Sequence, residues 1–158
     1  MFNWKVYFAA LILWVIIIAS CNTAFAVGYG PSKFYGPYNA EVVRVIDGDS
    51  IKVIAEIFPH IEANLNVRLE GIDTPELRGK CEKEKQLARA AKAFVEAQFP
   101  ASGNPWVLLR NVRDDKYSGR VVATVHITKT ETLNQMLLDS GHAVVYTGRG
   151  KRKDWCNG

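Results

Sequence analysis

Acidic and arginine side chains recur in three short segments, and these are the residues of the chain most able to do chemistry. The segments run from Asp47 to Ser50 (DGDS), from Arg68 to Glu76 (RLEGIDTPE) and from Asp115 to Arg120 (DKYSGR). Carboxylates bind hard divalent cations through oxygen, and guanidinium groups bind phosphate with paired hydrogen bonds. The combination predicts metal-assisted chemistry on a phosphodiester.

Two aspartates are the candidate metal ligands. Asp49 follows a predicted hairpin turn and Asp73 ends a predicted strand, so pairing of the strands would bring the two carboxylates together. With the backbone carbonyl of Thr74 they offer three oxygen ligands for Ca²⁺, and water completes the shell. The alternative is that both are turn aspartates that bond their own backbone. We prefer that alternative for Asp47.

A glutamate beside a metal-bound phosphate can orient or deprotonate the attacking water, and Glu76 is the candidate. It follows Pro75, which fixes the local backbone. The alternative is a solvated loop glutamate. Glu70 competes for the same role, although its place two residues after Arg68 also suits a simple ion pair with that arginine.

Arg68 and Arg120 are the candidate phosphate clamp. Their planar, permanently charged groups would stabilise the charge that develops on the phosphate oxygens. Each could instead form a surface salt bridge, and Arg113 is an alternative to Arg120. The three histidines have no metal-ligand spacing, and we find no Ser/His/Asp arrangement, zinc pattern or glycine-rich phosphate loop.

Alternating apolar residues and turn signals predict the elements that position these side chains. Strands are expected at 40–46, 50–57, 64–72, 106–112 and 120–127. Helices are expected at 81–99 and 131–140, with Gly141 as the stop of the second. The pattern predicts an α+β domain built on a five-stranded OB-fold barrel with one long and one short helix.

The first 26 residues resemble an export signal. Lys5 precedes fourteen apolar residues (6–19), too few for a membrane span, and Ala24 to Ala26 form an A-x-A cleavage site. Residues 18–21 (IASC) instead resemble a lipobox with Cys21 as a lipidated terminus, and an uncleaved anchor is the third reading. All three place the domain outside the cytoplasm, in the periplasm or secreted.

Cleavage would leave two cysteines, Cys81 and Cys156, in the mature chain. An exported domain with two cysteines favours one disulfide, which would tie the tail to the segment around Cys81. The alternative is two free thiols. The 158 residues carry 20 Lys plus Arg against 16 Asp plus Glu, a net charge of +4. This excess suits a polyanionic partner without establishing one.

Taken together, the three motifs in this order resemble the staphylococcal nuclease (thermonuclease) family over residues 40–147. The resemblance implies an OB-fold barrel decorated with helices. It also implies Ca²⁺-dependent hydrolysis of DNA and RNA that leaves 3′-phosphate ends. Each motif alone is weak, and the ordered set is strong.

Carried over residue by residue, the resemblance assigns a role to each matching position. It makes Asp49, Asp73 and the Thr74 carbonyl the calcium ligands and Glu76 the general base. It makes Arg68 and Arg120 the clamp, and it places Lys116 and Tyr117 on a neighbouring phosphate. Tyr146 is a candidate for base stacking.

This chain departs from the family pattern in three ways. Ser118 and Gly119 stand where the family usually has one glycine, which affects the aim of Arg120. Ser50 replaces a threonine. The tail after Tyr146 is too short for the long C-terminal helix of the staphylococcal enzyme, and a disulfide from Cys81 to Cys156 would hold this end instead.

The sequence therefore predicts four segments: a signal (1–26), an extended lead-in (27–39), the nuclease domain (40–147) and a basic tail (148–158). The expected partners are DNA and RNA, with single-stranded regions preferred. We expect no small-molecule cofactor, a monomer, and membrane attachment only through an N-terminal anchor. The alternatives are a non-catalytic nucleic-acid-binding module, which would not need the full set of acids and arginines, and an envelope lipoprotein.

Overall fold

The computed structural model describes residues 34–100, 102–103 and 105–157. Its elements are, in order, β1 (Tyr38–Asp47), β2 (Ser50–Phe58), β3 (Ile61–Leu69), β4 (Ile72–Asp73), α2 (Glu82–Ala97), β5 (Trp106–Asp114), β6 (Arg120–His126), α3 (Leu133–Asp139) and β7 (Val144–Val145). The predicted signal segment and Cys21 lie outside the described residues. None of the helices in the described part of the chain is long and apolar enough to cross a membrane.

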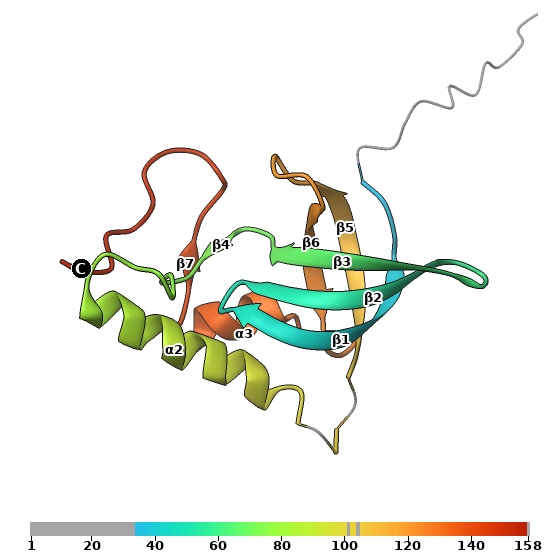
Figure 1. The fold of residues 1–158 in the computed structure, drawn as a ribbon, viewed down its shortest axis with the longest axis horizontal. Coiled ribbons are helices and arrows are strands. Elements are labelled where there is room, and N and C mark those ends of the chain that lie inside the picture. Colours follow the sequence, from blue (N-terminus) through green and yellow to red (C-terminus); the bar gives the residue numbers. More distant parts are fainter. Residues whose placement is uncertain (1–33, 101, 104, 158) are drawn as a thin grey trace, which may run out of the picture. The chain divides into compact units, whose positions relative to one another are not determined.

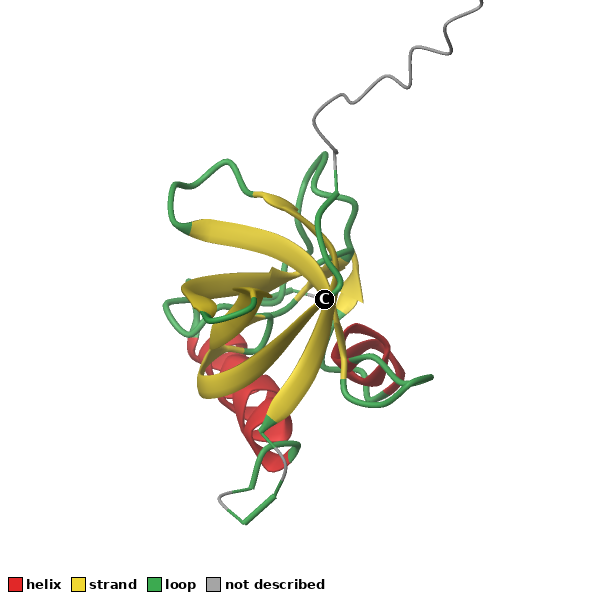
Figure 2. Ribbon diagram, turned by 90° about the vertical axis from the view of Figure 1, so that its right-hand side faces the viewer, coloured by secondary structure: helices red, strands yellow, loops and turns green. Residues whose placement is uncertain are grey.

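Five strands close into a barrel in the order β1-β2-β3-β6-β5, and β5 returns to pair with β1. Only the β3–β6 pair is parallel among these five strands. Alternate residues such as Val53, Val67, Leu109 and Val125 point inward and are fully buried. Figures 1 and 2 show the strands wrapping around this core with both helices outside it. The predicted OB-fold barrel with one long and one short helix is confirmed.

The predicted third strand was placed too late in the chain. Strand β3 begins at Ile61, directly after a tight turn in which His60 adopts φ 65°, and it ends at Leu69. Gly71 then turns the chain with φ 77°, a conformation that favours glycine. As a result Ile72 and Asp73 leave the barrel and pair with β7 in a separate two-stranded sheet. The turn at Gly71 thus separates Asp73 from β3 and makes it the last residue of the short strand β4.

The turn between β1 and β2 packs on the long helix. Ala88, Ala91 and Val95 form the buried face of α2. A side chain at Gly48 would place its Cβ only 2.8 Å from the Cβ of Ala91, so the turn approaches the helix this closely because residue 48 is glycine. This contact fixes the position of Asp49, the next residue.

The tail returns to the beginning of α2. Cys156 forms a disulfide with Cys81, with 6.1 Å between the Cα atoms. Cys81 is also the N-cap of α2, and its sulfur accepts a hydrogen bond from the backbone N–H of Glu84. Figure 1 shows the tail looping from β7 to this end of α2. The cysteine pair left by the predicted cleavage is therefore joined in the structure.

Candidate active site

Arg68 joins the two candidate metal-binding aspartates. Asp49 and Asp73 are 4% and 0% exposed. Nη1 of Arg68 lies 2.7 Å from Asp49 Oδ2, and its Nη2 lies 3.8 Å from Asp73 Oδ1. Pairing of Ser50 with Arg68 in the β2–β3 ladder, and a 2.8 Å hydrogen bond from Leu69 N–H to the Asp49 carbonyl, hold the two segments side by side. The structure brings these three residues into one cluster.

Thr74 and Glu76 continue from Asp73 in the loop between β4 and α2. Thr74 is 1% exposed and Pro75 is buried, whereas the side chain of Glu76 is 43% exposed. The loop places a buried backbone carbonyl and a half-exposed carboxylate directly beside Asp73. The four residues predicted to surround a metal and its water therefore lie in one cluster with Arg68.

The sequence reasoning missed Arg152, which the tail brings into the same cluster. Its Nε donates to Asp73 Oδ1 at 2.5 Å, and its Nη1 lies 2.7 Å from Glu76 Oε1. Its Nη2 also contacts Asp73 and lies 3.5 Å from the Thr74 carbonyl oxygen. Two arginines therefore bridge the acids in pairs: Arg68 joins Asp49 to Asp73, and Arg152 joins Asp73 to Glu76.

Burial shapes the electrostatics of this cluster. Desolvation raises the pKa of Asp49 above its ordinary value, and Glu76 and Asp47 add like charge, while Arg68 and a hydrogen bond from Ser50 act the other way. Burial also raises the pKa of Asp47. For Arg152, desolvation is outweighed by the hydrogen bonds to Asp73 and Glu76, and its pKa is raised. Burial is therefore the main cause that disfavours the charged carboxylates of Asp47 and Asp49.

The donor set fits a hard divalent cation. Asp49, Asp73 and Glu76 contact two arginines, so this group carries a formal charge of −1; Asp47 lies nearby, where Lys92 acts on it. The Oδ2 atoms of Asp49 and Asp73 are buried and accept no hydrogen bond; the contact of Asp49 Oδ2 with Arg68 is an ion pair without hydrogen-bond geometry. Carboxylate and carbonyl oxygens are the ligands that Ca²⁺ and Mg²⁺ use.

The carboxylates are nevertheless not gathered around a point. Among the described residues, the group of three ligand atoms within 4.8 Å of one another comprises Cys81, Glu84 and Cys156. Both sulfurs of that group are joined in the disulfide, which removes them as thiolate ligands. The oxygens of Asp49, Asp73 and Glu76 form no such group, since arginines lie between them.

Glu70 pairs with Arg113 rather than with Arg68. Arg113 Nη2 donates to Glu70 Oε1 at 2.9 Å, and the Thr124 hydroxyl lies 3.4 Å from Glu70 Oε2. Both alternatives raised by the sequence, Glu70 as base and Arg113 as clamp, are therefore engaged with each other. No contact joins this pair to the aspartates in the described structure.

Arg120 lies on the outer face of the barrel near Arg68. In the parallel β3–β6 pair, Arg120 is opposite Asn66 and Arg68 is opposite Val122, so the two arginines are two residues apart along the ladder. The Arg120 guanidinium is bound to the Asp115 carboxylate and lies 4.7 Å from the ring centroid of Tyr117. The ion pair with Asp115, a residue that the sequence reasoning did not select, holds the Arg120 side chain in this direction.

Lys116, Tyr117 and Tyr146 flank the cluster on two different segments. Lys116 Nζ lies 5.0 Å from the ring centroid of Tyr117, which is 56% exposed. Tyr146 follows β7, and its N–H donates to the Gly71 carbonyl at 2.8 Å. Its hydroxyl donates to the Gly150 carbonyl at 3.3 Å. Tyr146 is thus placed beside β4, and its ring supports the tail.

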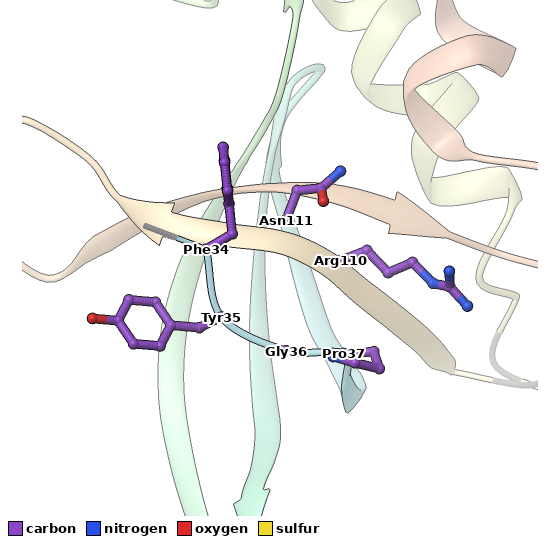
Figure 3. A pocket seen from close by; sticks show the side chains of 6 residues that line it. All are labelled: Phe34, Tyr35, Gly36, Pro37, Arg110 and Asn111. Carbon is purple, nitrogen blue, oxygen red and sulfur yellow. The ribbon is translucent and has the colours of Figure 1, made fainter. Parts of the chain in front are cut away.

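A hollow of about 280 Å³ lies elsewhere, between the lead-in and β5. Its lining consists of Phe34, Tyr35, Gly36, Pro37, Arg110 and Asn111. Figure 3 shows Tyr35 and Arg110 pointing in opposite directions. Binding pockets present polar groups that converge on a ligand, and these do not converge. We place the candidate site at the acid cluster instead.

The fold and the site define an OB-fold domain with an acid–arginine cluster at its strand ends. The family described as "Staphylococcal nuclease homologue" matches residues 66–155, and the chain belongs to this family. The match starts in β3, after Asp49, and includes the tail as far as Trp155. A curated relative is Protein ParB from Escherichia coli, which is 29% identical over 139 residues, covering 83% of this chain and 70% of the relative.

Proposed function

We propose that this protein is an exported, Ca²⁺-dependent nuclease that hydrolyses phosphodiester bonds of DNA and RNA. One observation carries the proposal: two buried aspartates, a buried carbonyl and a half-exposed glutamate meet beside Arg68. Membership of a nuclease-like family supports it. Asp49, Asp73 and the Thr74 carbonyl would hold the metal, which supplies polarisation of a phosphate oxygen when bound.

In this proposal the protein side chains divide the remaining work. Glu76 accepts the proton of the attacking water, whose oxygen forms a bond to phosphorus as the bond to the 5′ oxygen breaks. The departing 5′ oxygen takes a proton from solvent water, so the products are a 3′-phosphate and a free 5′ hydroxyl. Arg68 stabilises the charge on the phosphate oxygens, and Arg120 joins it from the neighbouring strand. Arg120 must turn from Asp115 to do so.

The exposed residues around the cluster suit a polyanionic strand. Lys116 and Tyr117 offer a charge and an aromatic face beside Arg120, and Tyr146 lies beside β4. Stacking on rings requires unpaired bases, so single-stranded regions are the preferred substrate. Export accords with the apolar N-terminal segment of the sequence and with the disulfide.

The decisive experiment is cleavage of plasmid and single-stranded DNA by the purified domain, with Ca²⁺ or with a chelator. We expect cleavage in the presence of Ca²⁺ and none in the presence of the chelator. Glu76→Gln should lower the rate with Ca²⁺ by about 10²-fold or more, because it removes the proton acceptor. Glu70→Gln is the matched control. It changes a glutamate paired with Arg113, and its rate should stay within a few-fold of wild type.

Three outcomes distinguish a nuclease that uses Glu76 as its base from a nuclease with another base and from a binding module. Absence of Ca²⁺-dependent cleavage by the wild type would reject the enzyme, and retained binding of DNA would then favour a binding module. Full activity of Glu76→Gln would keep the nuclease and reject Glu76 as its base. Loss of activity in Glu70→Gln alone would move that role to Glu70.

A further inference from the structure

The C-terminal tail carries a cation into the acid cluster from the far end of the chain. Arg152 is 79 residues from Asp73, and its guanidinium contacts Asp73, the Thr74 carbonyl and Glu76. These are two of the three proposed metal ligands together with the proposed base. A residue of the tail therefore contacts one oxygen of Asp73 and the Thr74 carbonyl, two groups that a divalent cation would use.

Arg152 and a metal would compete at Asp73, because both are cations drawn to the same buried carboxylate. The Oδ1 atom of Asp73 accepts from Arg152 Nε at 2.5 Å, a distance typical of a strong charged hydrogen bond. Asp73 is fully buried and its Oδ2 has no hydrogen-bond partner, so the conflict with a metal lies at Oδ1 and in the nearby positive charge of Arg152. The guanidinium must withdraw from Asp73 before a metal takes that oxygen, and the free energy of its contacts is lost in the exchange.

The tail is anchored so that Arg152 stays near the acids. Cys156, four residues later, is bonded to Cys81, which follows Glu76 by five residues. Trp155 is 6% exposed and lies under the Lys153 ammonium at 4.2 Å. On the other side, the Tyr146 hydroxyl donates to the Gly150 carbonyl. Anchoring at both ends gives the guanidinium a high effective concentration at the site.

We propose that Arg152 is an active-site residue that competes with the divalent cation for Asp73, the Thr74 carbonyl and Glu76, so that the disulfide-anchored tail sets the metal concentration at which the site fills. This inference rests on the proposed function, because it takes the metal site from there. Without metal, Arg152 neutralises acids that would otherwise repel one another. With metal, it is released toward the substrate side of the cluster.

The test is calorimetric titration of Ca²⁺ into the intact disulfide-bonded domain without nucleic acid. If Arg152 blocks the site in about nine-tenths of the molecules, its removal raises the apparent affinity about tenfold. Arg152→Gln should therefore bind Ca²⁺ about tenfold more tightly than wild type. Arg152→Lys keeps the charge but lacks the fork that bridges two acids, so its affinity should lie between the two.

Arg149→Gln is the matched control, because it removes the same charge from an exposed position of the same tail. Its Ca²⁺ affinity should stay close to that of wild type. A second readout is the thermal midpoint: saturating Ca²⁺ should raise the midpoint of Arg152→Gln more than that of wild type. This measurement also shows directly that the variant folds.

The outcomes distinguish this inference from the proposed function. Binding of Ca²⁺ by wild type with equal or weaker binding by Arg152→Gln would overturn the inference and leave the proposed metal site intact. The same gain in Arg149→Gln would also overturn it, since net charge alone would then explain the effect. Absence of Ca²⁺ binding in every variant would remove the proposed metal and the inference together.

Discussion

Glu84 holds the loop that carries Glu76, and it is not itself one of the proposed metal ligands. It stands in the first turn of α2, where its Oε2 accepts from Lys80 N–H at 2.9 Å and its Oε1 from Glu76 N–H at 3.5 Å. A Cβ at Gly79 would lie 2.4 Å from the Glu84 carboxyl carbon, so the loop closes this tightly around Glu84 only with glycine at 79. One side chain thus fastens the backbone beside the proposed base.

We predict that Glu84→Ala lowers the free energy of unfolding by about 1 kcal/mol, because two backbone donors lose their acceptor. Glu82→Ala is the control. Glu82 lies in the same turn of α2 and pairs with Arg89 on the surface. Its removal takes away a favourable negative charge at the helix N-terminus but leaves the loop contacts unchanged. Denaturant midpoints measure both. Equal losses in the two variants would show that Glu84 acts through the helix alone.

At the level of elements, α3 fixes the corner between β3 and β4. Asn134 is 8% exposed, and its Nδ2 donates to the Glu70 carbonyl at 2.8 Å. Its Oδ1 accepts from Val125 N–H in β6 at 3.0 Å. One amide thus joins α3, β6 and the end of β3. The corner at Glu70 and Gly71 sets the distance between Arg68 and Asp73, so α3 positions the site without contributing to it.

Asn134→Ala should lower the free energy of unfolding by about 2 kcal/mol, since it leaves a buried N–H and a buried carbonyl without these partners. Gln135→Ala is the matched control, because Gln135 is exposed on the same helix and its side-chain amide donates to Asp139 on the surface. Urea unfolding of both variants measures the difference. A loss no larger than that of Gln135→Ala would contradict the role of Asn134 as a joint.

At the level of the molecule, the disulfide joins the beginning of α2 to the C-terminal tail. It closes a loop with a sequence separation of 75 between the start of α2 and the tail. The same bond holds Arg152 near Asp73 and the Glu76 loop near the tail. Stability and site geometry therefore depend on one covalent link.

Cys81→Ser with Cys156→Ser should lower the free energy of unfolding by about 4 kcal/mol, the loop-entropy value for a ring of this size. Serine at 81 remains a good N-cap, so the loss reports the cross-link. Unfolding of the variant and of reduced wild type by guanidinium should agree. If oxidised wild type is no more stable than the variant, the disulfide does not contribute to the free energy of unfolding and acts only by holding the tail in place.

Local patterns in the sequence determined the barrel and the acid cluster. Strand alternation and turn residues predict the five strands, because a half-buried strand needs an apolar residue at every second position. Asp49, Asp73 and Thr74 were selectable because each stands at the end of a strand or turn. The start of β3 was misjudged because the sequence of residues 61–63 is equally compatible with a connection. The next residues gave little help, since Asn64 and Asn66 are polar and face outward.

Contacts between distant segments were decided only by the tertiary structure. The pairing of Arg113 with Glu70 spans β6, which lies between β5 and β3 in the barrel, and the direction of Arg120 depends on Asp115 in its turn. Arg152 reaches Asp73 through a tail without regular structure, whose path no periodicity describes. The sequence contained one signal for it, a basic segment ending in a cysteine whose partner lies just after the Glu76 loop. The sequence by itself thus determined which groups are candidates for chemistry, whereas the packing of distant segments decided which cation each acid meets.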